Sequence, residues 1–304
     1  MPEASRTRTN AAFGVVFESE LELPGLTPLA GRESSLRVRL TDGARAPRRG
    51  VLIWETTIDG LVYRMWQQPD GYLMVHEGSC EYFLSAALDE LSCAPRDPAA
   101  PGWRRFLLDT VLWSTSLLRG HELLHAGAAS GPGGVVAVAS GTGGGKTSLV
   151  LELMRRGLSL FSDDIVALRR HEDGLLAHPG PALMNIPAAV ADAPGQELAS
   201  FDGECWVAFE QVDPTPRPVE AICLLERGEG AELGLERIET TALDLLRHSV
   251  GFDVLRARRR ARFELFAELA TVPVWRLTAG LDEETARIAD VLEPLLAAAP
   301  PVPA

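Results

Sequence analysis

The sequence predicts an α/β fold preceded by a β-rich domain, and three features of the chain carry this prediction. Residues 35–76 hold several alternating or β-rich runs that are separated by turn signals. The apolar run Gly134–Ala139 leads directly into a glycine-rich loop and then into a helical pattern. Further along the chain, apolar runs again give way to helical spacing. Strands that are joined through helices are typical of α/β proteins.

The first part of the chain is expected to form strands. In Ser35–Leu40 the apolar residues alternate with polar ones, which is typical of a half-buried strand. The runs Val51–Thr57 and Leu61–Gln67 are rich in β-forming residues. The turn signal Pro69-Asp70-Gly71 follows, and Tyr72–His76 is expected to return as a hairpin.

A domain boundary is predicted at Ala94–Gly102, where proline and alanine accumulate without periodicity. We therefore expect an N-terminal β-rich domain over residues 1–98 and a nucleotide-binding catalytic domain over residues 103–304. The second domain is expected to open with a helix at Trp103–Gly120 and a buried strand at Gly134–Ala139. The later elements expected are helices at 147–156, 241–250, 253–269 and 282–297 and strands at 158–161, 165–170, 175–178, 219–226 and 273–277.

The glycine-rich loop Ser140–Thr147 fits the phosphate-binding pattern G-x-x-x-x-G-K-[ST], with serine in place of the first glycine. Its backbone N–H groups can surround phosphates, and the following helix directs its positive end at them. Lys146 is the only lysine among 29 basic residues, and its slim ammonium suits a tight loop better than a guanidinium does. An incidental lysine in a flexible turn is the alternative. We expect ATP to contact Gly141, Thr142, Gly143, Gly144, Gly145, Lys146, Thr147 and Ser148.

Two adjacent carboxylates, Asp163 and Asp164, end the next apolar strand, seventeen residues after the loop lysine. In P-loop proteins an acidic residue at such a position holds the metal ion, and a second carboxylate can accept a proton from an attacking hydroxyl. We expect Asp163 to act as the base, and Asp164 to hold Mg²⁺ together with Thr147. A solvated turn or helix cap is the alternative for this pair.

The segment Leu124–Leu168 resembles the catalytic core of the HPr kinase/phosphorylase family. The features that carry the resemblance are, in chain order, His125 before alanine, a short strand, the glycine-rich loop, Leu151–Leu153, Arg156-Gly157 and Asp163-Asp164. By itself, His125 would be read as a structural hydrogen-bonding residue. The resemblance implies instead a catalytic position near the transferred phosphoryl group. It also implies a core similar to that of HPr kinase and phosphoenolpyruvate carboxykinase, with ATP and Mg²⁺ as cofactors, and it allows a homo-oligomer.

The resemblance implies a kinase that transfers the γ-phosphoryl group of ATP to a serine hydroxyl of a peptide or small protein. The N-terminal region looks more like that of the HPr-kinase-related proteins of peptide-modification gene clusters than like the N-terminal domain of HPr kinase itself. The family's Glu-x-Arg-Gly-type segment has no counterpart between residues 169 and 217. Two other classes stay open, a small-molecule phosphotransferase and a nucleotide switch that hydrolyses ATP or only binds it.

Charge and hydropathy exclude other classes of function. A net charge of −13 argues against general binding to nucleic acid, and no stretch of the sequence approaches a membrane span, so we expect a cytoplasmic protein without membrane or nucleic-acid partners. Five arginines within seven residues interrupt the acidic character, either as a solvated helix face or as a dock for an acidic peptide. These residues are Arg256, Arg258, Arg259, Arg260 and Arg262.

Overall fold

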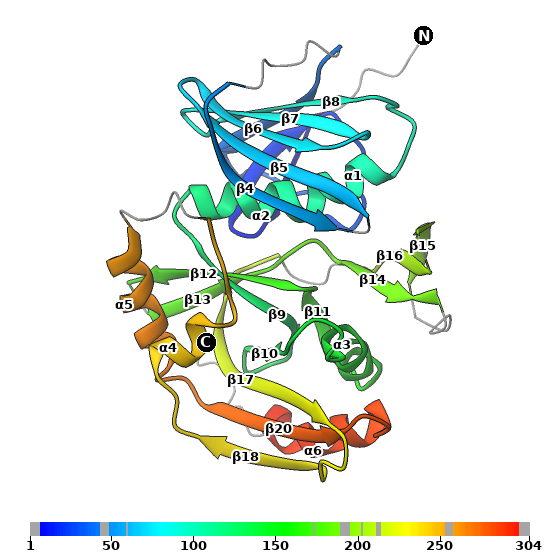
Figure 1. The fold of residues 1–304 in the computed structure, drawn as a ribbon, viewed down its shortest axis with the longest axis vertical. Helices are drawn as coiled ribbons and strands as arrows, with labels where there is room; N and C mark the ends of the chain where they lie inside the picture. Colours follow the sequence, from blue (N-terminus) through cyan, green and yellow to red (C-terminus); the bar gives the residue numbers. More distant parts are fainter. Residues whose placement is uncertain are drawn as a thin grey trace.

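The computed structural model arranges the chain as a large N-terminal sheet above a mixed C-terminal sheet, with a helical segment between them (Figure 1). None of the helices within the described residues has the length and apolar character needed to cross a bilayer. The structure describes residues 7–42, 49–58, 60–172, 174–188, 195–201, 203–210, 214–252 and 258–297.

The N-terminal sheet has eight strands in the order β1-β2-β3-β8-β7-β6-β5-β4. β2 and β8 run parallel to β3, and the other neighbours are antiparallel. The strands predicted at 35–40, 51–57, 61–67 and 72–76 are present. The strands are β1 (Arg8–Ala12), β2 (Val15–Ser19), β3 (Leu36–Leu40), β4 (Val51–Ile58), β5 (Leu61–Gln68), β6 (Gly71–His76), β7 (Cys80–Ser85) and β8 (Glu90–Pro95).

The helix predicted at Trp103–Gly120 forms as three consecutive pieces, which are α1 (Gly102–Phe106), a π-helical turn η1 (Leu107–Val111) and α2 (Leu112–Leu118). Its apolar residues are buried against the N-terminal sheet in a core that also takes in Leu183 and Trp206 from much later in the chain. Segments on both sides of residue 98 therefore share one hydrophobic core. π-Helical turns occur frequently at functional sites.

The larger C-terminal sheet follows the order β10-β9-β12-β13-β17-β20-β18, with β11 and β19 paired to β9. β17 runs parallel to both β10 and β20, and the remaining pairs are antiparallel. Its strands are β9 (Glu122–Ser130), β10 (Val135–Ala139), β11 (Ser159–Ser162), β12 (Ile165–His171), β13 (Gly174–His178), β17 (Arg217–Gly228), β18 (Gly234–Ile238), β19 (Ser249–Val250) and β20 (Val274–Gly280).

A small third sheet, β14-β16-β15, lies beside the C-terminal sheet (Figure 1). Its strands are β14 (Leu183–Pro187), β15 (Gln196–Phe201) and β16 (Glu204–Ala208). The remaining helices are α3 (Lys146–Arg155), α4 (Ala242–Leu246), α5 (Arg259–Leu269) and α6 (Thr285–Ala297).

The predicted α/β class needs correction, because the described chain is mostly β, with mixed sheets and few helices. Parallel pairing is confined to two contacts in each large sheet, where an α/β domain would have a mainly parallel sheet. The helix predicted at 241–250 ends at Leu246, because Ser249 and Val250 pair with β9 instead. The predicted helix at 253–269 is described from Arg259, and residues 253–257 lie outside the described residues.

Candidate active site

The glycine-rich loop connects the buried strand β10 to helix α3, as predicted. Gly143 and Gly145 adopt φ values of +73° and +93°, a region that glycine enters without a steric penalty. The space around Gly141 and Gly143 is open, whereas a Cβ atom at Gly144 would lie 2.5 Å from the Ser140 Oγ. Ser140 therefore fills the room that Gly144 leaves, which accounts for serine at the first position of the pattern.

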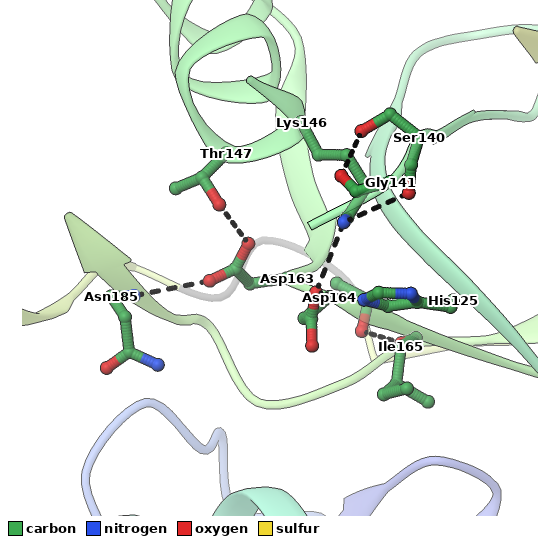
Figure 2. A network of polar contacts seen from close by, with 10 residues as sticks. His125, Ser140, Gly141, Lys146, Thr147, Asp163, Asp164, Ile165 and Asn185 are labelled. Carbon is green, nitrogen blue, oxygen red and sulfur yellow. Dashed lines mark hydrogen bonds and ion pairs between the residues drawn. The ribbon is translucent and has the colours of Figure 1, made fainter. Parts of the chain in front are cut away.

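Helix α3 begins at Lys146 and fixes the lysine by burying one face against the sheet, with Leu149, Val150 and Leu153 fully buried. Lys146 itself is only 7% exposed. Its Nζ lies 3.5 Å from the Ser140 carbonyl oxygen and 3.6 Å from the Asp164 Oδ1 (Figure 2). The ammonium of Lys146 is thus held between a carbonyl oxygen and a carboxylate at the N-terminus of α3, the end of a helix that favours bound anions.

Asp163 follows β11 and is held by two hydrogen bonds. The Thr147 hydroxyl donates to Asp163 Oδ1 at 3.2 Å, and the Asn185 backbone N–H donates to Oδ2 at 3.2 Å (Figure 2). Burial raises the pKa of Asp163 to about 7, and the charges of Asp164 and Asp109 add to this, although the two hydrogen bonds lower it. A cation bound beside Asp163 would lower this pKa and keep the carboxylate ionised at neutral pH.

Asp164 points to the other side of the turn, toward His125 and Lys146. Its φ of +62° is in the left-handed region, which aspartate tolerates better than most residues and which is often found at functional sites. The His125 Nε2 lies 2.9 Å from Asp164 Oδ1. Burial raises the pKa of Asp164, but the hydrogen bond and charge of His125 and the charge of Lys146 outweigh it, so the pKa lies below its ordinary value.

The structure thus brings together all five predicted catalytic and metal-binding side chains, but it pairs them differently from the prediction. We expected Thr147 and Asp164 to share a metal ion, whereas Thr147 contacts Asp163. Nowhere in the described ranges do three His, Cys, Asp or Glu side chains gather into a group that could hold a metal by themselves. A Mg²⁺ site made from one carboxylate, one hydroxyl and the phosphates of a nucleotide fits this arrangement.

Three residues near the site were missed by the sequence analysis. Asn185 orients Asp163 from β14, Asp109 on η1 contributes charge, and the His248 carbonyl accepts the His125 backbone N–H at 2.6 Å. The sequence could have indicated Asp109, because it is a carboxylate inside the apolar run Phe106–Leu112. It could not have indicated Asn185 or His248, because their positions depend on strand pairing between distant segments.

The arginine cluster lies on and before α5, and its described members differ in their surroundings. The Arg258 Nη2 lies 2.6 Å from the Glu122 Oε1, and the Arg262 Nε lies 3.5 Å from the Glu122 Oε2, so both arginines point inward at a carboxylate that is only 3% exposed. Arg259 and Arg260 are exposed, and Arg260 pairs with Glu264. Docking of an acidic segment therefore stays a prediction for Arg259 and Arg260. Arg256 lies outside the described residues.

A cavity of about 310 Å³ opens beside the two aspartates. Thr142, Thr147, Asp163 and Asp164 line one end of it. The other end is formed by the β1–β2 turn, by α1 and η1, and by strands β14 and β16. A molecule of modest size in this cavity would therefore contact both the carboxylates and the segments that pack against the N-terminal sheet.

The similarity of this chain to known proteins is distant. No protein-family model matches the sequence, and no curated protein matches it. In structure, the chain is similar to the HPr(Ser) kinase/phosphatase from Coxiella burnetii, with a TM-score of 0.29 and 14% sequence identity, over 57% of this chain and 94% of that chain. At these values, function has to be argued from the residues of the site.

Proposed function

We propose that this protein is an ATP- and Mg²⁺-dependent kinase that transfers the γ-phosphoryl group to a serine hydroxyl of a peptide or small protein. One observation carries the proposal. Three separate segments of the chain bring five polar side chains to one place, as the pair Thr147–Asp163 and the group Lys146–Asp164–His125. Thr147 and both aspartates line an open cavity. A protein that only binds nucleotide has no need of the His125–Asp164 pair.

The residues present fit a nucleotide and its metal ion. The open space at Gly141 and Gly143 leaves room for phosphate oxygens, and the buried Lys146 supplies the charge that would pair with them. Thr147 and Asp163 would hold Mg²⁺, which is the reverse of the order expected from sequence for the two aspartates. When bound, Mg²⁺ neutralises charge on the phosphates.

Asp164 is then the residue placed to accept the hydroxyl proton, and His125 orients it through the 2.9 Å contact. In the proposed step, the acceptor oxygen forms a bond to the γ-phosphorus as the bond between that phosphorus and the bridging oxygen of ADP breaks. The hydroxyl proton passes to the Asp164 carboxylate, and ADP leaves. Lys146 stabilises the negative charge on the moving phosphoryl group, because positioning and charge neutralisation dominate phosphoryl transfer.

A small-molecule acceptor is the second candidate, and the cavity favours it. About 310 Å³ is at the lower end of the range for small-molecule sites and holds a few amino-acid residues at most. A peptide acceptor would therefore have to insert a terminus or an extended segment.

The experiment that tests the proposal measures ADP formation and phosphorylated product together. The purified protein is incubated with ATP and Mg²⁺, with and without the peptides encoded beside its gene, and the peptides are examined by mass spectrometry. The proposal expects a phosphoserine that is absent with Lys146→Ala and present with Arg155→Ala, which removes a cation from the far end of the same helix. ADP formation without any phosphorylated acceptor would favour the hydrolytic switch.

A further inference from the structure

The cavity beside the aspartates has walls that come from three distant parts of the chain. Phe13 lies in the β1–β2 turn, Leu108 in η1, and Leu183 and Trp206 in the small sheet, and all four are buried. The turn is fixed in place, because the Phe13 N–H donates to the Pro179 carbonyl at 2.7 Å and the Ser116 hydroxyl donates to the Phe13 carbonyl at 2.5 Å. The N-terminal sheet therefore supplies one wall of the cavity.

The polar groups of these walls include carboxylate and amide oxygens, which accept hydrogen bonds. Asp109 and Glu204 contribute carboxylates, and the Asn185 Oδ1 is buried with no hydrogen-bond partner among the described residues. Among the residues that line the cavity in the described chain, Arg105 is the one base, and it lies 3.5 Å from Glu204 in an ion pair. Buried acceptors without partners are rare in folded proteins and call for a donor.

The charges of the lining residues indicate which kind of hydrogen-bond donor a ligand would carry. If Asp163 is matched by a metal ion and Asp164 by Lys146 and His125, the charged side chains that remain among the described lining residues are Asp109, Glu204 and Arg105, of which Glu204 and Arg105 form an ion pair. The described lining at this end of the cavity therefore holds more carboxylates than basic groups. An ammonium group carries three donors and no acceptor, so it suits such a wall, whereas a carboxylate would be repelled.

We propose that this cavity is the acceptor site, and that it takes a hydroxyl compound with an ammonium group close to the hydroxyl. Free amino alcohols and the N-terminal serine of a peptide share this chemistry. The assignment as an acceptor site rests on the proposed function, whereas binding itself does not. The apolar walls cover the carbon skeleton, Asp109 and Glu204 attract the ammonium, and Asn185 receives one of its hydrogen bonds. The hydroxyl then faces Asp164.

The test uses three probes with the same hydroxymethyl group and different charge, titrated calorimetrically without nucleotide. L-Serinamide carries an ammonium, N-acetyl-L-serinamide is neutral, and N-acetyl-L-serine carries a carboxylate. The expected order of affinity is the order in which they are named here, with about tenfold between the first two, as one partly screened charge pair would give. Equal binding of the three probes, or the strongest binding by N-acetyl-L-serine, would overturn the proposal.

Two variants locate the effect. Asp109→Asn and Glu204→Gln keep the shape of the side chain and remove its charge, so each should reduce the preference for L-serinamide over the neutral probe by several fold. Glu264→Gln removes an exposed carboxylate from α5 and should leave the preference intact. A preference that survives both pocket variants would place the ammonium elsewhere and contradict the proposal.

Two further titrations are needed. One distinguishes a peptide terminus from a free amino alcohol as the ligand, and the other tests the ammonium site independently of the kinase function. The amide of Ser-Gly-Gly is compared with L-serinamide, and tighter binding of one or the other identifies a peptide terminus or a free amino alcohol. ATP with Mg²⁺ is titrated into the same samples. If L-serinamide binds and ATP does not, the proposed kinase function fails while the ammonium site stands. If ATP binds and none of the probes does, the ammonium site fails alone.

Discussion

The imidazole of His125 contacts the carboxylate of Asp164 at 2.9 Å across two neighbouring strands, β9 and β12. The pairing of Ile165 with His125 in this sheet sets the distance, so the histidine is positioned by backbone register. Asp163 faces the opposite way, toward Thr147. The two adjacent aspartates therefore have different partners, and different roles are expected for them.

The difference between the aspartates can be measured by single amide substitutions. Asp164→Asn should keep affinity for ATP and Mg²⁺ and lower transfer by about 10²- to 10⁴-fold, because the amide cannot accept the hydroxyl proton. Asp163→Asn should instead raise the Mg²⁺ concentration needed for nucleotide binding. Calorimetric titration of ATP with and without Mg²⁺, together with turnover, distinguishes the two. Identical behaviour of both variants would mean that the pair does not divide these roles.

Lys146 is predicted to contribute most of the charge for phosphate binding. Lys146→Ala should weaken ATP by about 10- to 100-fold, the loss expected for one charge-assisted hydrogen bond of about 1.5–3 kcal/mol. Lys146→Arg should also fail to support turnover, because a planar guanidinium does not fit beside the Ser140 carbonyl. Ser140→Gly serves as the matched control within the loop and should retain affinity. Full turnover by Lys146→Arg would contradict the tight-loop interpretation.

The Glu122 carboxylate and its two arginines are predicted to stabilise the fold. Burial raises the pKa of Glu122 even though Arg258 and Arg262 lower it. Arg258→Ala would leave this buried charge with one partner, Arg262 at 3.5 Å, and a loss of about 3–5 kcal/mol in the free energy of unfolding is expected. The exposed Arg260→Ala should cause no measurable change in a urea titration. Tests of peptide docking should therefore reverse the charges of Arg259 and Arg260 and spare Arg258.

The stability of the protein should decline in acid through two histidines, of which His121 is buried and His178 is half-buried. The His121 and His178 rings contact edge to face with centroids 4.8 Å apart. Burial lowers the pKa of His121 to about 3 and that of His178 to about 4, and neighbouring positive charges add to this. The unfolded chain binds these protons first, so their contribution is present above pH ~6.5 and is lost as the pH falls toward 4.

The expected slope is about 1.4 kcal/mol per pH unit for each ring in this window. His178→Gln removes one titrating group, so it should flatten the slope between pH 6.5 and 4 relative to the unsubstituted protein. Carboxylates contribute equally to the pH dependence of stability in the variant and in the unsubstituted protein, so their contribution cancels when the two slopes are compared. Equal slopes in urea titrations would show that His178 is protonated without cost in the folded state.

Local sequence patterns predicted β3 to β6, the loop with α3, and strands β12 and β13, because alternation, glycine and turn residues act over a few positions. The sequence did not predict β9, because the second half of this strand, Ala126–Ser130, consists of small residues with low β propensity. Its Gly127 is needed for close packing, since a Cβ atom there would lie 3.0 Å from the Val150 Cγ2. Pairing with β10 and β12 makes this segment a strand, and pairing between distant segments is not visible in a local pattern.

Because local patterns do not reveal pairing between distant segments, only part of the candidate site could be predicted from the sequence. The loop and the aspartates have motif signals, so their proximity could be expected. Which aspartate faces Thr147 depends on the turn at Asp164, where φ is +62° and the Ile165 N–H donates to the Asp163 carbonyl at 2.7 Å. The small sheet that contributes Asn185 and Trp206 forms by pairing across residues 183–208. The sequence carries a hairpin signal at Asp202-Gly203 for the pairing of β15 with β16, but it carries none for the pairing of β14 with β16, which are far apart in the chain.

The most direct test of the central claim is to follow the γ-phosphate of radiolabelled ATP. The protein is incubated with Mg²⁺ and with serine-bearing peptides or amino alcohols, and the label is separated into ATP, free phosphate and phosphorylated acceptor. If the protein is a kinase, label should appear in a phosphoserine or phosphate ester, depend on Lys146 and Asp164, and persist with Arg155→Ala. Label that appears only as free phosphate with every acceptor, or transfer that survives Asp164→Asn undiminished, would contradict it.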